Sequence, residues 1–303
     1  FGADLKRVLE MSDVLIEVLD ARDPLSCRTS SVEDYVNSFR PEVAIVLVLN
    51  KIDLAPPHSV DAWVRHLSAS YPTIPFKSAT GTRRGNSVMQ AKERVSEASA
   101  SQRKTHDCLG AQHLIQVLKE IGHGTAGFGG RAKMTVGVVG YPNVGKSSLV
   151  NSLIRAKSAE TGDKPGVTRS LQELRLDKGI ILLDTPGVVF DSHHTSSLSA
   201  IMRHSIAIEK IEDVEGLASQ VMERCGQDTI ARHYNISESG EGAGGGMLEQ
   251  IAAKRGKVAP GGGLDTEAAA RVLLQDLNKG RLSFHTMPPA PPAECLIGDA
   301  QVV

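Results

Sequence analysis

The sequence predicts an α/β domain with a doubly wound parallel sheet, followed by a small helical domain. Two observations lead to this prediction. Short apolar runs rich in Val, Ile and Leu alternate with amphipathic segments up to residue 183, and only helical patterns follow. Apolar runs without polar alternation are typical of parallel strands buried on both faces. A chain of 303 residues is long enough for one large and one small domain.

Six strand candidates are bounded by turn residues, at residues 13–19, 43–49, 74–76, 135–139, 170–176 and 180–183. Helical patterns separate most of them, at residues 32–39, 60–70, 111–121 and 145–155. Alternation of this kind places a crossover helix between successive parallel strands. We therefore expect one six-stranded sheet with helices on its faces.

The last part of the chain is expected to be helical, at residues 198–210, 214–225, 229–234, 248–254 and 266–278. Asp265 is placed to cap the first turn of the last helix. We predict three parts: the α/β domain over residues 1–194, a helical domain over 195–285, and an extended Pro-rich tail over 286–303.

The composition narrows the class of protein. No apolar run approaches the roughly 18 residues of a membrane span, so no membrane partner is expected. The formal net charge of −1 argues against general nucleic-acid affinity, so any RNA contact has to be local. The four cysteines lack CxxC spacing, which favours neither a zinc site nor a disulfide framework. The chain begins with Phe1 rather than Met, so we expect further residues upstream, including any targeting signal.

A phosphate-binding loop is the strongest motif. Residues 140–147, GYPNVGKS, directly follow a strand candidate and open an amphipathic helix. Backbone amides at such a helix start surround phosphates, and the helix dipole favours anions. We expect Lys146 to reach the β- and γ-phosphates, Ser147 to bind Mg²⁺ and Ser148 to contact the α-phosphate. The nucleotide-binding residues expected in this loop are Asn143, Val144, Gly145, Lys146, Ser147 and Ser148.

A guanine-reading motif, NKID, occupies residues 50–53 at the end of an apolar run, where ligands bind in open α/β sheets. The Asp53 carboxylate can accept hydrogen bonds from guanine N1–H and N2–H₂, donors that adenine does not present in that geometry. The Lys51 stem is expected to pack on the base, and Asn50 to brace the loops.

Two further strand ends are expected at this pocket. Ser78 and Ala79 follow the next strand and are expected to offer backbone amides to guanine O6. Asp20 and Arg22, which end the first strand, are expected to brace the loops around the nucleotide. The sequence therefore predicts a GTP/GDP site.

Residues that follow the phosphate loop in the sequence are expected to surround the γ-phosphate and its Mg²⁺. Asp184 is expected to hold Mg²⁺ through water, the Gly187 N–H to face the γ-phosphate, and Thr168 to be a direct Mg²⁺ ligand. The catalytic candidates are Lys146, Thr168 and Gly187. Small GTPases place a water-orienting Gln where Val188 stands, and an apolar side chain cannot orient water. Intrinsic hydrolysis is therefore expected to be slow.

Two assignments have alternatives. Asn143 lies in a GxPNxGKS loop, in which Asn commonly coordinates a K⁺ bridging the phosphates, but it could also only brace the loop. Lys254, Arg255 and Lys257 are RNA-binding candidates, but such a cluster can also be a solvated face.

The order of these motifs is unusual. The NKID and SAT motifs precede the phosphate loop, whereas the phosphate loop leads in an ordinary small GTPase. Placing residues 134–190 before residues 1–121 restores the usual order. The five glycines within residues 122–133 suit the joint that this rearrangement requires. The first domain is therefore predicted to be a circularly permuted, six-stranded P-loop GTPase domain.

The chain resembles the circularly permuted GTPases of the nucleostemin and nucleostemin-like family, and is similar to the bacterial 50S-assembly GTPases. The resemblance spans nearly the whole chain and includes DVLIEVLDARDPLSCR, VLVLNKIDL, VGVVGYPNVGKSSLVNSL and LDKGIILLDTPGVV. It implies slow, ribosome-stimulated GTP hydrolysis, maturation of the large subunit in the nucleolus or nucleus, and an rRNA-contacting helical domain. Its implied partners are the pre-60S particle, large-subunit rRNA, and ribosomal proteins or assembly factors. The lysine-rich N-terminal segment of nucleostemin-type proteins is not in this sequence.

Two other functions fit the same motifs. One is a GTPase acting on another RNA or on a protein partner, and the other is a nucleotide-gated binding protein with negligible turnover. The permutation joins the DTPG switch directly to the helical domain, so we expect the γ-phosphate to control that domain's position.

Overall fold

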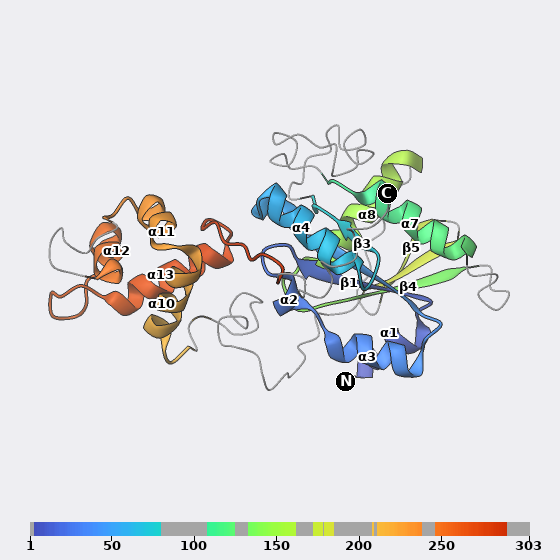
Figure 1. The fold of residues 1–303 in the computed structure, drawn as a ribbon, viewed down its shortest axis with the longest axis horizontal. Helices are drawn as coiled ribbons and strands as arrows, with labels where there is room; N and C mark the ends of the chain where they lie inside the picture. The colour runs from blue at the N-terminus through green and yellow to red at the C-terminus, as the bar shows by residue number, and fades with distance from the viewer. Residues whose placement is uncertain are drawn as a thin grey trace, which may run out of the picture.

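The computed structural model describes residues 3–79, 108–124, 133–161, 172–177, 179–184, 208, 211–237 and 246–289. Within them, six strands form one sheet in the order β3–β2–β1–β4–β6–β5 (Figure 1). The strands are β1 Val14–Asp20, β2 Ala44–Asn50, β3 Thr73–Pro75, β4 Met134–Val139, β5 Gln172–Asp177 and β6 Ile180–Asp184. All strands are parallel except β5, which pairs antiparallel with β6 at one edge. The predicted six-stranded sheet is confirmed.

The chain enters the sheet at its centre. β1 pairs with β2 on one side and with β4 on the other, and every residue of β1 is buried. The sheet therefore extends outward from β1 in two directions, one carrying the base-reading motifs and the other carrying the phosphate loop. Ligands of open α/β sheets bind where the strand order reverses in this way.

Helices cover both faces of the sheet (Figure 1). Helices α1 and α3 lie side by side on one face, where the Arg40 guanidinium at the end of α3 donates to the carbonyls of Leu9 and Glu10. Helices α7 and α8 pack together on the other face. The helices of this domain are α1 Ala3–Met11, α2 Pro24–Cys27, α3 Ser30–Phe39, α4 Pro57–Ser68, α7 Ala111–Gly124 and α8 Lys146–Thr161, with the 3-10 turn η1 Ile52–Leu54.

Some helix limits differ from the sequence predictions. The helix expected from residue 60 begins at Pro57, because proline fits the first helical turn, where its missing N–H is not needed. Helix α8 continues to Thr161, six residues beyond the expected end. Helix α1 was not predicted, although its apolar residues Leu5, Val8 and Leu9 recur at helical spacing and are fully buried.

Four helices form a second core: α10 Val214–Cys225, α11 Gln227–Tyr234, α12 Met247–Arg255 and α13 Thr266–Asn278. Helix α13 packs against both α10 and α12. The Asp265 carboxylate accepts a hydrogen bond from the Ala268 N–H at 2.8 Å, so the predicted cap is confirmed. Of the helix expected over residues 198–210, only residue 208 belongs to the described part, and the limits predicted for the domains stay predictions.

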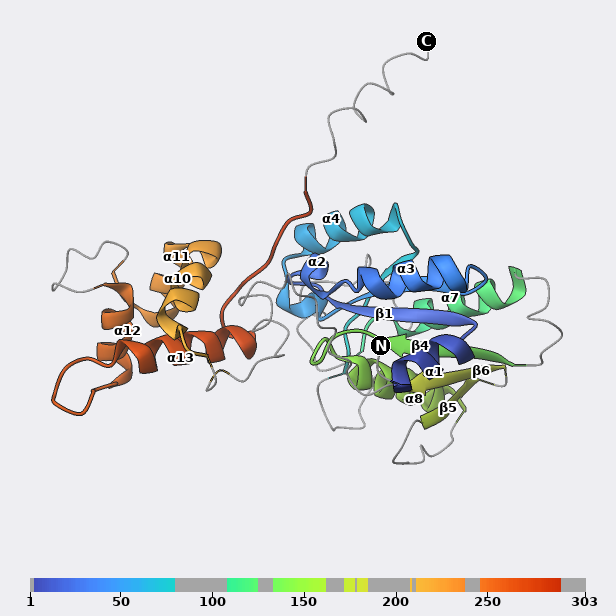
Figure 2. The same cartoon turned by 90° about the horizontal axis from the view of Figure 1, so that it is seen from below.

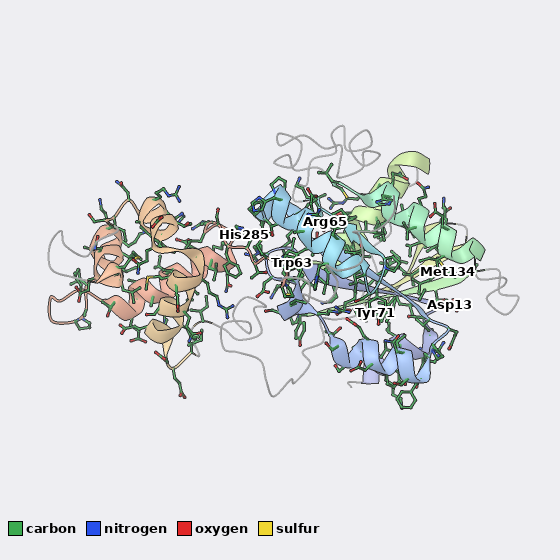
Figure 3. The ribbon with its side chains drawn as sticks, viewed as in Figure 1. Asp13, Trp63, Arg65, Tyr71, Met134 and His285 are labelled. Atoms are coloured by element: carbon green, nitrogen blue, oxygen red, sulfur yellow. The ribbon has the colours of Figure 1, made fainter. Side chains whose placement is uncertain are left out.

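The segment after α13 leads from the second core back to the α/β domain (Figure 2). Leu282 and Phe284 are still buried in the helical core. His285 then meets His58 of α4 edge to face, with ring centroids 5.7 Å apart, near Trp63 (Figure 3). Residues 282–289 carry no helix or strand, and residues 290–303 lie outside the described part, so the extended tail expected over 286–303 stays a prediction. Within that part, no helix combines the length and apolar character needed to cross a membrane.

One carboxyl is buried in the middle of the sheet. Glu17 of β1 is 1% exposed, and its Oε1 accepts hydrogen bonds from the Thr29 N–H at 2.5 Å and the Thr29 hydroxyl at 2.6 Å. Burial raises the pKa of Glu17 from 4.5 to about 8, with nearby Glu33 adding to the effect and the Thr29 hydrogen bonds opposing it. Between these two pH values the folded state holds a proton that the unfolded state releases, so stability falls as pH rises.

We expect Glu17→Gln to stabilise the protein, by an amount that grows from about pH 5 to about pH 8.5. Over this window the folded wild type keeps the proton on Glu17 that the unfolded chain releases, whereas the amide titrates in neither state. The measurement is the thermal midpoint of both proteins across the window, with about 2–4 °C expected per kcal/mol at this chain length. Glu10→Gln, at a largely exposed side chain of α1, is the control. A constant difference between Glu17→Gln and wild type across the window would contradict the prediction.

Candidate nucleotide-binding site

The predicted motifs meet at one edge of the sheet. Asp20 and Asn50, the last residues of β1 and β2, are paired in register. The phosphate loop leaves the end of β4, and β6 ends at Asp184, with its backbone beside Val138. Motifs that lie far apart along the chain thus lie at neighbouring strand ends.

The backbone of the phosphate loop needs two of its glycines. Gly140 has φ +140°, and a Cβ there would lie 2.7 Å from the Val18 carbonyl oxygen. Gly145 has φ +102°, and its Cβ would lie 2.2 Å from the Asn50 Nδ2. Both conformations are strained for residues with a side chain.

The Lys146 side chain folds back over the loop that precedes it. Its ammonium donates to the carbonyls of Gly140 at 2.9 Å and Tyr141 at 2.7 Å, and the residue is 5% exposed. The phosphate loop therefore surrounds the Lys146 ammonium at the N-terminus of α8. The helix dipole at that end also favours an anion.

The Asn50 side chain joins three loops. Its Nδ2 donates to the Val144 carbonyl at 2.9 Å, and its Oδ1 accepts from the Ser78 hydroxyl at 3.1 Å and the Ser78 N–H at 3.3 Å. One buried amide thus connects the NKID turn, the phosphate loop and the loop after β3.

The two amides expected to face guanine O6 are hydrogen-bonded within the protein. The Ser78 N–H is directed to Asn50, and the Ala79 N–H donates to the Ser152 hydroxyl of α8 at 3.0 Å. The role of Ser152 could not be predicted, because its hydroxyl comes from another part of the chain. Binding of guanine O6 by either amide requires exchange of these hydrogen bonds.

Next to Asn50, two cations share one buried carboxylate. Asp20 Oδ2 accepts from Lys51 Nζ at 2.9 Å and from Arg22 Nη2 at 2.8 Å. Arg22 Nε completes the pairing with Asp20 Oδ1 at 3.0 Å. Burial alone would raise the pKa of Asp20, but Lys51 and Arg22 outweigh it and hold that pKa well below its ordinary value. Asp20 therefore stays ionised and keeps the start of the NKID turn in place.

The Asp53 carboxyl lies in the η1 turn with a solvent-accessible side chain. Partial desolvation raises its pKa and Asp20 adds to the rise, whereas Lys77 and Lys51 oppose it. An accessible carboxylate that has lost part of its hydration is well suited to accept hydrogen bonds from a base.

The other predicted site residues are placed only in part. Ser147 and Ser148 are exposed in the first turn of α8, and Asn143 is exposed with a left-handed φ of 60°. Thr168, Gly187 and Val188 lie outside the described residues. Across the described ranges, no three His, Cys, Asp or Glu side chains converge into a metal site.

Within the basic cluster Lys254, Arg255 and Lys257, Arg255 contacts other side chains of its own domain. The Arg255 guanidinium lies 3.5 Å from the buried Asp276 carboxylate and 5.2 Å from the centre of the Tyr234 ring. Burial would raise the pKa of Asp276, but hydrogen bonds from Arg281 and Tyr234 and the charge of Arg255 lower it. Arg255 therefore helps to compensate a buried charge in its own domain, a contact that was not predicted from the sequence.

Comparison with known proteins identifies the chain's relatives. It is 40% identical over 289 residues to guanine nucleotide-binding protein-like NSN1 of Arabidopsis thaliana and 40% identical over 286 residues to guanine nucleotide-binding protein-like 3-like protein of Mus musculus. These alignments cover 95% and 94% of this chain. Over most of its length the chain is thus similar to the guanine nucleotide-binding protein-like 3 group of proteins. Each alignment covers 48% of the relative, so the chain spans about half the length of these curated proteins.

Further matches point to the same group of proteins. Nucleolar GTP-binding protein 2 of Yarrowia lipolytica is 34% identical over 286 residues, covering 94% of this chain and 50% of that protein. The model of the 50S ribosome-binding GTPase family matches residues 135–236. The GNP-bound structure of YlqF from T. maritima has a TM-score of 0.58 at 23% identity, covering 92% of this chain and 95% of YlqF. This likeness supports the circularly permuted fold.

The close approach of Asn50 gives a prediction for the phosphate loop. Gly145→Ala is expected to lower the thermal midpoint, because the methyl group would clash with Nδ2 and φ is unfavourable for alanine. A destabilisation of about 1–3 kcal/mol is expected, about 2–4 °C per kcal/mol. Gly263→Ala is the matched control, because a Cβ there meets no atom within 4 Å. Equal midpoints for the two variants would contradict the prediction.

Proposed function

We propose that this chain binds GTP and GDP with Mg²⁺, hydrolyses GTP slowly, and acts in maturation of the large ribosomal subunit. The observation that carries the nucleotide site is the Asn50 side chain, which joins the base-reading turn to the phosphate loop through the Val144 carbonyl. A base bound at the turn and phosphates bound in the loop are thereby held at a fixed separation. The residues of both parts meet at the carboxyl edge of the parallel strands, where nucleotides bind in this fold class.

The phosphate loop fits a nucleotide and its metal ion. The buried Lys146 ammonium can exchange its two carbonyl contacts for β- and γ-phosphate oxygens, and the backbone amides of residues 143–148 can bind the same group. Ser147, Thr168 and, through water, Asp184 would hold Mg²⁺. The ion would neutralise charge on the β- and γ-phosphates.

Hydrolysis is proposed to be slow in the isolated chain. Val188 follows the Gly187 that is proposed to face the γ-phosphate, and its apolar side chain offers no hydrogen bond to an attacking water. Asn143, exposed and left-handed in the phosphate loop, is the proposed ligand of a K⁺ that would offset phosphate charge. The bound ribosomal particle would stimulate hydrolysis by supplying the water-orienting group that Val188 cannot provide.

The cellular role is proposed from the relatives. One is named a nucleolar GTP-binding protein, and the matching family is described as ribosome-binding. We infer a nucleolar or nuclear protein whose partners are the pre-60S particle, its rRNA, and ribosomal proteins or assembly factors. The permutation would let the γ-phosphate act through the DTPG segment on the helical domain. A GTPase acting on another RNA or on a protein partner is the alternative.

Asp53→Asn is expected to weaken GTP binding and to increase affinity for xanthosine nucleotides. The amide presents a donor where guanine needs an acceptor, and xanthine offers an acceptor at that position. The decrease in GTP binding should be roughly 1–3 kcal/mol per buried hydrogen bond broken. Affinities for GTP, ATP and xanthosine triphosphate, measured on wild type and variant, test this. Equal affinity of the wild type for ATP and GTP would contradict the assignment of the base pocket.

The ribosomal role is tested through the helical domain. Neutralising Lys254 and Lys257 to Gln is expected to weaken pre-60S co-sedimentation and to reduce the salt slope of RNA binding by about 1 for each phosphate that is no longer bound. Arg255 is left unchanged, because its pairing with Asp276 would confound the result. GTP affinity should be retained, since both lysines lie in the helical domain.

The matched control is Lys6→Gln with Lys119→Gln, which removes the same charge from the α/β domain. Binding should be measured with GDP and with a non-hydrolysable GTP analogue. Normal binding by the double variant would remove the lysines from the RNA contact. Failure of wild type to co-sediment with pre-60S, with GTP binding intact, would favour the alternative function.

A further inference from the structure

The Arg22 guanidinium joins the two domains. Its Nε and Nη2 pair with the Asp20 carboxylate at 3.0 and 2.8 Å, and its Nη1 donates to the Leu277 carbonyl at 3.1 Å. Leu277 lies in the last turn of α13, and its carbonyl also accepts a hydrogen bond from the Gly280 N–H, just beyond the helix, at 3.0 Å. Arg22 is 1% exposed, so this contact is formed away from water.

The carboxylate that binds Arg22 also binds the base-reading turn. Asp20 Oδ2 accepts from the Lys51 ammonium at 2.9 Å. Lys51 stands between Asn50 and Asp53 in the turn proposed to read guanine, and its backbone is left-handed with φ 63°. A continuous chain of charged hydrogen bonds therefore runs from the end of α13 to the base pocket.

A second set of hydrogen bonds fastens the segment that follows α13. The Thr286 N–H donates to the Arg22 carbonyl at 2.8 Å. The Thr286 carbonyl accepts from the Trp63 indole N–H at 2.8 Å and from the Ser59 hydroxyl at 3.0 Å. Residues 277–286, called the C-terminal segment below, thus bind both the side chain and the backbone of Arg22.

The same segment touches the turn that carries Asp53. A Cβ on Gly280 would lie 3.1 Å from both methyl carbons of Leu54, the residue that ends η1. Gly280 also has φ +68°, so glycine is suited to this approach. The C-terminal segment therefore contacts residues that come before Lys51 in the sequence, at 20–22, and a residue that comes after it, Leu54.

We propose that residues 277–286 form part of the base-recognition site, with Arg22 and Asp20 as the positioning residues that connect them. Binding of the guanine base then stabilises the docked segment, and docking stabilises the base pocket. GDP and GTP act alike, because both carry the base and none of these contacts involves the phosphate loop. This coupling rests on the guanine-nucleotide binding proposed above and is separate from control by the γ-phosphate.

Thermodynamic linkage makes the coupling measurable from either side. If the base slows opening of the segment, then loosening the segment must weaken nucleotide binding by the same factor. Coupling of this kind commonly amounts to about 5–150-fold. Because Asp20 lies between two cations, removal of Arg22 leaves Lys51 with a carboxylate that has lost its second partner.

The experiment uses the full chain and follows amide hydrogen exchange of the peptide that contains Thr286. In wild type, GDP and a non-hydrolysable GTP analogue are expected to slow exchange equally. In Arg22→Met, exchange should be fast and unaffected by nucleotide, and both nucleotides should bind more weakly by one common factor. Trp63→Phe, a conservative change outside the pocket, should also weaken both nucleotides by one factor, and it serves where Arg22→Met fails to fold.

Arg28→Met is the matched control, because Arg28 pairs with Glu33 of α3 at 2.6 Å instead of joining the C-terminal segment. It should retain wild-type exchange and affinity. The coupling is overturned if GDP binds normally without slowing exchange, or if only the GTP analogue slows it. Absence of GDP binding by the unaltered chain would overturn the proposed function together with the coupling.

Discussion

The nucleotide site depends on the side-chain amide of Asn50, which has to serve as donor and acceptor at the same time. Its nitrogen binds the Val144 carbonyl and its oxygen binds Ser78, so the amide sets the separation of three loops. This arrangement leaves no room for a side chain at Gly145. A carboxylate of the same shape would lack the donor, and a shorter side chain would not reach Val144. The glycine pattern of the phosphate loop is thus partly dictated by a residue 95 positions earlier.

The permuted order of the motifs is possible because a parallel sheet gathers strand ends regardless of the order in which the chain supplies them. β1 and β4 are neighbours in the sheet, yet one precedes the phosphate loop by more than 100 residues. What the site requires is that Asp20, Asn50 and Gly140 lie at the carboxyl ends of adjacent strands. The order β3–β2–β1–β4–β6–β5 meets this requirement.

The strands and the motif positions could be predicted because their signals are local: apolar runs, a glycine-rich turn, and polar residues at strand ends. The contacts that were not predicted are between distant segments. Ser152 binds the amide of Ala79, and Asp276 binds Arg255. In the sequence, Ser152 and Asp276 cannot be told from other polar residues of their helices. A hydrogen-bond partner that comes from another segment leaves no periodic pattern. Helix α1 did carry a signal, in the spacing of Leu5, Val8 and Leu9.

The hydrogen bond between Thr286 and Arg22 spans 264 positions, which bears on how the protein is made. During synthesis the base-reading turn emerges early, but the Leu277 carbonyl and the Thr286 amide that hold Arg22 emerge only at the end of the helical domain. Pairings of such long range form late, because closure of a long loop costs chain entropy before the pairing can stabilise anything. Until then the Arg22 side chain has only Asp20 as its partner in this network. The contacts that hold Arg22 beside the base-reading turn are therefore completed last, although the turn itself is translated early.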